Sequence, residues 1–231
     1  MAKRSIWSNL VLFGALFYTV CACSIPIPGG GEPPRLYVLT PKSTFPEGLP
    51  TAKWQILIEP PIAAAGLSTA RIPLQDSPIE LRYFTRAKWT DFAPKMVQSL
   101  MVESFENSEK IVGVGREQIG LRSDFVLKTE LREFQAEYKQ RLADDVSILS
   151  SGSRPPVIRV RINAKLVKMP RREIVASETF EQTIKAEHNT MQAIIRAFDK
   201  SLGKVLKSVV VWTLEAGELH SPNRLTKKSK L

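Results

Sequence analysis

Residues 157–169, with the sequence VIRVRINAKLVKM, decide the fold because their apolar and polar side chains alternate almost without a break. Successive side chains of a β-strand point to opposite faces of the sheet, so one face of this strand is apolar and the other is polar. The alternation therefore predicts a strand with one buried face and one face in water. The inward set is Ile158, Val160, Ile162, Ala164 and Leu166, and the outward set is Arg159, Arg161, Asn163 and Lys165.

The segments on either side of this stretch predict its neighbours in the sheet. Pro170 to Glu173 turn the chain into a second strand, Ile174 to Lys185, which forms a hairpin with the first. Before the stretch, a Ser-rich loop over residues 147–156 follows a long strand from Phe125 to Tyr138. The apolar face of that long strand changes register near Arg132, which predicts a β-bulge.

Shorter strands and two amphipathic helices complete the predicted domain. Strands are expected over residues 35–40, 54–59 and 79–84, where β-branched and aromatic residues are followed by prolines or turns. A helix with Thr90 as its N-cap follows Trp89, because apolar residues recur there at helical spacing.

A second helix is expected from Thr190 to Leu214, and Gly217 is expected to end it. About six strands, mostly linked as hairpins, and two helices indicate an α+β domain. We expect residues 35–219 to form a single, mostly antiparallel sheet with both amphipathic helices packed on one face. The basic residues 220–231 are expected to be a disordered tail.

The amino-terminal residues are typical of a bacterial export signal. Lys3 and Arg4 precede an apolar run from Ile6 to Val20, which at about 15 residues is short for a membrane span. The sequence Val20-Cys21-Ala22-Cys23 at its end resembles the lipobox of bacterial lipoproteins, with Cys23 as the modified residue.

The lipobox resemblance implies that residues 1–22 are a signal peptide and that Cys23 carries fatty-acyl chains, which together anchor the protein to a membrane. Ser24, in place of aspartate, implies sorting to the outer membrane, on its periplasmic side. Residues 23–34 are rich in proline and glycine and predict an extended tether. Two alternatives stay open, an uncleaved amino-terminal membrane helix and secretory cleavage without lipid.

The rest of the sequence gives little support for an enzyme. His188 and His220 lie too far apart in the sequence to predict a metal site, and Gly113 and Gly115 are interpreted as turn glycines rather than a phosphate loop. No catalytic residue, metal or cofactor is therefore expected. The net charge of +10 is concentrated partly in the leader and the tail, and no cluster of basic and aromatic residues indicates nucleic-acid binding.

The outward basic residues of the deciding strand form one candidate binding face. Arg159, Arg161 and Lys165 are expected to lie in a row, where they could hold a partner or phosphate groups. A sheet face that is simply solvated is the alternative.

The order of elements resembles a known protein family. Tyr37-Val-Leu39, the Ile-Leu-Ile-Glu strand before Pro60, and Ile79-Glu-Leu-Arg-Tyr83 leading to Trp89 are followed by a long final helix. After a lipobox, this order is similar to that of the ABC-type transport auxiliary lipoproteins, which include the lipoprotein of the paraquat-inducible system. The charged loop around residues 139–156 and the basic tail depart from that pattern.

The family resemblance implies a non-catalytic periplasmic component of a lipid transport pathway. Its partners would be an ABC transporter and a mammalian-cell-entry (MCE) domain protein, with phospholipid as cargo. Two other functions stay open, a structural or regulatory lipoprotein (a cell-wall synthase activator or a secretion-machine assembly factor) and a domain that itself holds lipid between helix and sheet. Homo-oligomerisation is also left open.

Overall fold

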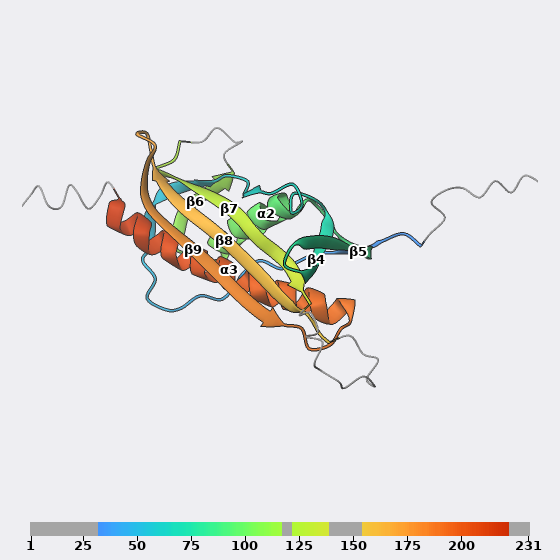
Figure 1. Ribbon diagram of the computed structural model, residues 1–231. Coiled ribbons are helices and arrows are strands. Elements are labelled where there is room, and N and C mark those ends of the chain that lie inside the picture. The colour runs from blue at the N-terminus through green and yellow to red at the C-terminus, as the bar shows by residue number, and fades with distance from the viewer. Residues whose placement is uncertain (1–31, 117–121, 139–153, 222–231) are drawn as a thin grey trace, which may run out of the picture. The chain divides into compact units, whose positions relative to one another are not determined.

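The computed structural model describes residues 32–116, 122–138 and 154–221, which form one mixed β-sheet and two helices (Figure 1). Cys23, the tether up to residue 31 and most of the basic tail lie outside the described residues. The elements, in chain order, are β1 Arg35–Tyr37, β2 Ala52–Ile58, β3 Ile62–Ala63, β4 Arg71–Ser77, β5 Glu80–Trp89, α2 Ala93–Asn107, β6 Ile111–Arg116, β7 Phe125–Glu137, β8 Val157–Lys168, β9 Glu173–Lys185 and α3 Met191–His220. The expected α+β class is confirmed.

Strand β7 lies at the centre of the sheet. One of its edges pairs antiparallel with β8 along the whole strand, and β8 in turn pairs antiparallel with β9. The other edge pairs in succession with β2, β3 and β4, all parallel. Beyond these, β5 pairs antiparallel with β4 and parallel with β1, and β6 pairs parallel with β2. The sheet is therefore mixed, with long antiparallel and short parallel pairings, because long connections, and not hairpins alone, join neighbouring strands.

The deciding strand has the two faces that its alternation predicts. The five inward residues of β8 from Ile158 to Leu166 are fully buried. The predicted bulge is also present, because Leu131 pairs with Ile162 whereas Glu133 pairs with Arg161, which leaves Arg132 as the extra residue of β7. Local alternation therefore predicted both the strand and its irregularity.

One hydrophobic core lies between the helices and the inward face of the sheet. Apolar side chains of α2, of α3 and of the inward faces of β7 and β8 belong to the same buried cluster, and Figure 1 shows both helices behind these strands. At its centre Trp89, Phe134 and Phe198 contact one another, with ring centroids 5.2–5.5 Å apart. This aromatic cluster joins β5, β7 and α3.

The first helix begins later than expected. Trp89 is the last residue of β5, where its N–H donates to the carbonyl of Ala70, and its side chain is 1% exposed. The N-cap of α2 is Phe92 rather than Thr90, and no side chain caps the helix. The predicted start was wrong because Trp89 fits the helical spacing as well as it fits the end of a strand.

Two glycine interpretations were also wrong. Gly113 and Gly115 belong to strand β6 and not to a turn. Gly217 does not end α3, which continues to His220. At Gly217 the helix backbone approaches Trp54 so closely that an added Cβ would lie 2.3 Å from the Cζ2 atom of the indole. The glycine therefore permits contact between α3 and β2. The predicted start of the second helix is confirmed, since α3 begins at Met191 and the hydroxyl of its N-cap, Thr190, accepts from the N–H of Ala193.

Candidate functional site

Arg159 and Arg161 lie on the polar face of the sheet, where they meet glutamates of both neighbouring strands. The Arg159 Nε atom is 2.8 Å from Glu137 Oε1 and 3.2 Å from Glu133 Oε2, and its Nη1 atom is 2.7 Å from Glu181 Oε1. Arg161 Nη1 is 3.4 Å from Glu133 Oε1. We call these five residues the charge ladder, since they cross β7, β8 and β9 in one row.

The charge ladder is internally compensated. The hydrogen bond that Arg159 donates to Glu137 raises the pKa of the Arg159 guanidinium above its ordinary value, so the arginine stays charged under all ordinary conditions. Two arginines face three carboxylates, and an incoming phosphate would have to displace a carboxylate that is already hydrogen-bonded. The arrangement therefore favours the interpretation of a solvated, self-paired sheet face over that of an anion-binding row.

Lys165 does not join the charge ladder. It lies opposite Lys128 of β7 and Ser177 of β9 in the register, and Lys128 forms an ion pair with Glu59. Among the described residues no ion pair is formed by Lys165. The three predicted basic residues are thus divided between a compensated pair of arginines and a separate lysine.

We expect the Arg159→Met substitution to lower the free energy of unfolding by about 1–2 kcal/mol, because it leaves the three glutamates of the charge ladder with a single arginine, Arg161, on a partly buried surface. Urea unfolding at low and high salt measures the change, and the loss should be smaller at high salt because screening weakens the repulsion. Lys165→Met is the matched control on the same strand and face, with an expected change within about 0.5 kcal/mol. Equal effects of the two substitutions would show that the ladder contributes no stability.

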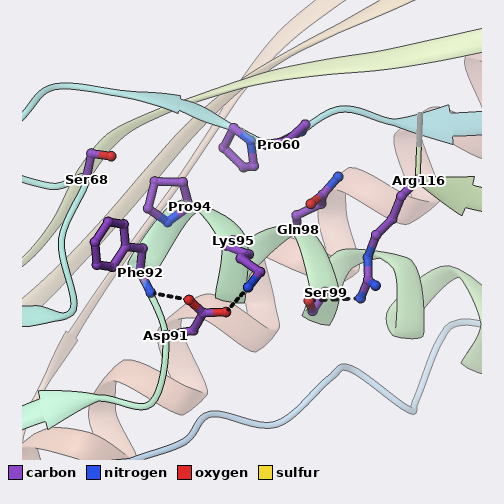
Figure 2. Close-up of a pocket in the computed structure, with 10 residues that line it drawn as sticks. Pro60, Ser68, Asp91, Phe92, Pro94, Lys95, Gln98, Ser99 and Arg116 are labelled. Carbon is purple, nitrogen blue, oxygen red and sulfur yellow. Dashed lines mark hydrogen bonds and ion pairs between the residues drawn. The ribbon is translucent and has the colours of Figure 1, made fainter. Parts of the chain in front are cut away.

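A pocket of about 570 Å³ lies beside the start of α2 (Figure 2). Four segments line it: the residues that follow β2, the loop between β3 and β4, the turn and first helical residues of α2, and the end of β6. The proline pair ends β2 because proline has no N–H to continue the ladder. The lining residues are Pro60, Pro61, Ser68, Asp91, Phe92, Pro94, Lys95, Gln98, Ser99 and Arg116.

The charges of the pocket are unequally partnered. Lys95 Nζ lies 2.9 Å from Asp91 Oδ2, and this hydrogen bond, followed by the one from the Phe92 N–H, lowers the pKa of Asp91, which keeps the carboxylate ionised. Arg116 donates from Nη2 to the Ser99 hydroxyl at 3.0 Å. Within the described part of the chain, no carboxylate pairs with Arg116. The pocket therefore has one cation in excess.

This pocket could not be predicted from the sequence. Its residues come from positions 60–61, 68, 91–99 and 116, and none of these segments has a motif that indicates binding. Phe92 fits the helical spacing of apolar residues after Trp89, which would predict a buried side chain, whereas 57% of the residue's surface is exposed. The ranges that the structure describes contain no group of three metal-ligating side chains. They also contain no helix with the length and apolar character of a membrane span.

Comparisons with known proteins agree with this fold. A family model described as ABC-type transport auxiliary lipoprotein component matches residues 37–210. The crystal structure of a Xanthomonas campestris protein superposes with a TM-score of 0.72 at 29% identity, and the match covers 80% of this chain and 98% of that one. A second crystal structure, of an uncharacterized protein, has a TM-score of 0.58 at 11% identity over 78% of this chain and 97% of that one, which is a likeness of fold alone.

A curated relative extends the comparison at the level of sequence. An uncharacterized protein of Bradyrhizobium diazoefficiens is 26% identical over 193 residues, which cover 81% of this chain. The chain spans about half of that relative's length, since the match covers 47% of it.

Proposed function

The chain belongs to the family of ABC-type transport auxiliary lipoprotein components, and on this premise we propose that it is the outer-membrane-anchored, non-catalytic component of an MCE-type lipid transport system. In this proposal the acylated Cys23 holds the domain at the periplasmic side of the outer membrane. The sheet then docks an MCE-domain protein, which receives lipid from an inner-membrane ABC transporter.

The single observation that carries the proposal is the family match over residues 37–210. It spans the fold from β1 into α3, so the resemblance concerns the whole domain rather than one motif. The lipobox at Cys23 gives the domain a means of staying near a bilayer. Tethering raises the local concentration of a docking domain, and so strengthens its contact with a partner without any new interaction.

Co-purification tests the proposal. The full-length chain, tagged at its carboxyl end and extracted in mild detergent from the organism that encodes it, should retain an MCE-domain protein. Deletion of its gene should weaken the outer-membrane lipid barrier, as measured by detergent sensitivity. Another outer-membrane lipoprotein with the same tag is the control for extraction. Retention of a cell-wall synthase or a secretion component instead, with an intact barrier on deletion, would show a structural or regulatory role.

A further inference from the structure

The pocket beside α2 has an apolar end and a cationic end. Figure 2 shows Phe92 and Arg116 at opposite ends of the lining, with Lys95 and Gln98 between them. We propose that this pocket binds a phospholipid, with one acyl chain along the prolines and Phe92 and with the phosphate at the guanidinium of Arg116. The inference rests on the proposed function for the class of cargo, and it adds the site that receives it.

Hydrogen bonds of the backbone hold the apolar end in place. Phe92 is more than half exposed. Covering a large apolar side chain of this kind removes its surface from water, which is favourable. The N–H of Phe92 donates to Asp91 Oδ1 at 2.8 Å, and the N–H of the next residue donates to the carbonyl of Thr69. The backbone that carries the ring is therefore already ordered. The protein would lose little further backbone entropy when a ligand covers the ring.

The walls of this end suit an acyl chain better than a peptide. Three of the lining residues, Pro60, Pro61 and Pro94, have no backbone N–H. A bound peptide needs partners for its own carbonyl groups, and it usually obtains them from backbone N–H groups of a strand edge or loop. A hydrocarbon chain has no such requirement. The pocket volume of about 570 Å³ is also within the range of small-molecule sites.

The cationic end suits a phosphate. Arg116 has a hydroxyl partner, Ser99, and no carboxylate partner among the described residues, so its charge is available to a ligand. A guanidinium offers parallel N–H donors that match two phosphate oxygens. Lys95 is already paired with Asp91.

Photolabelling of the full-length chain in a neutral maltoside detergent tests this assignment. The probe is a lysophosphatidylglycerol with a diazirine on its acyl chain, and labelled peptides are mapped by mass spectrometry. We expect labelling in the peptides that contain Pro60 and Phe92. The matching monoacylglycerol, which lacks the phosphate, should label them at least about tenfold less, the factor expected for the loss of a charge-assisted hydrogen bond.

Three substitutions make the test specific. Arg116→Gln should reduce labelling of these peptides by about tenfold, and Arg116→Lys should restore part of it because the charge is kept. Lys204→Gln removes the same charge from an exposed position of α3 that does not line the pocket, and it should leave labelling unchanged. Because Arg116 and Lys204 are both on the surface, thermal melting should show that all variants are folded.

The results separate this inference from the proposed function. Labelling that is absent from these peptides, equal for both probes, or equally reduced by Lys204→Gln overturns the lipid site. The Arg116→Gln chain should still co-purify with an MCE-domain protein, because the sheet and not the pocket is proposed to dock it. A failure of the lipid site therefore leaves the docking role intact. A wild-type chain that is labelled at these peptides but does not retain an MCE-domain protein would instead reject the docking role alone.

Discussion

The Cys23→Ala chain is expected to lack acyl chains and to disappear from the outer-membrane fraction. A thiolate is the side-chain nucleophile suited to accept a diacylglyceryl group, and alanine has no group to take its place. Several acyl chains make a durable anchor, whereas a domain without them has none. Intact-mass spectrometry and membrane fractionation measure the two effects. The wild type should begin at Cys23 and carry the mass of the acyl groups, and the variant should show neither.

Cys21→Ala is the matched control for the lipid anchor. Cys21 follows Val20, whose bulk does not suit the position before cleavage, so its replacement should leave the acylation and the membrane fraction unchanged. The two open alternatives give different results. An uncleaved membrane helix would keep residues 1–22 in the wild type, and a secreted protein would be cleaved but would have no acyl mass. Either result in the wild type would reject the lipid anchor.

The strands with one buried and one solvent-exposed face could be predicted from the sequence alone. In β8 every inward residue from Ile158 to Leu166 is apolar and buried, so the alternation of the sequence reports the two faces directly. The bulge at Arg132 was predicted for the same reason, since a one-residue shift of the pattern moves side chains to the other face. The local sequence was sufficient here, because the polarity of each residue follows from the face of the sheet on which it lies.

Strand pairing between distant segments could not be predicted. Strands β4 and β6 were missed, because Pro73 interrupts the first and Gly113 and Gly115 make the second resemble a turn. β4 pairs with the distant β7 as well as with its hairpin neighbour β5, and β6 pairs with β2, far away in the sequence. Tertiary context overrides weak local preference in such strands. The parallel pairings that involve β4 and β6 could therefore not be predicted, and those of β2 and β1 with distant strands left no local signal either.

The candidate site was predictable to an even smaller degree. The sequence placed Arg159 and Arg161 on the polar face correctly, but it could not show that Glu133, Glu137 and Glu181 from two other strands compensate them. A count of basic residues along one strand therefore overstated the charge available to a partner. The excess cation that the structure reveals is Arg116, at the end of a strand that the sequence did not predict.

The Gly217→Ala chain should be destabilised by at least about 2 kcal/mol, because an added methyl group in a packed core forces neighbours to move. The new Cβ would lie 2.3 Å from Trp54 Cζ2 and 2.7 Å from Cη2. Trp54 cannot easily yield, since it is 3% exposed and its ring lies edge-on to Phe125 with centroids 5.1 Å apart. Urea unfolding followed by tryptophan fluorescence measures the loss.

Gly203→Ala is the matched control in the same helix. An alanine at an unstrained helical position is favoured over glycine by about 0.5–1 kcal/mol, and apart from the adjacent residues and the backbone of the helix itself, no atom lies within 4 Å of a Cβ built at Gly203. The control should therefore gain stability where Gly217→Ala loses it. The opposite signs exclude a general effect of alanine on α3.

A double-substitution cycle identifies Trp54 as the cause. Trp54→Phe alone should lower the free energy of unfolding, because it leaves a cavity in the core. In the Gly217→Ala chain the smaller ring should make room for the methyl group, so the two losses should be less than additive by at least about 1 kcal/mol, as expected for residues in contact. Additive losses, or a Gly217→Ala chain as stable as the Gly203→Ala control, would show that the contact between α3 and β2 does not require glycine.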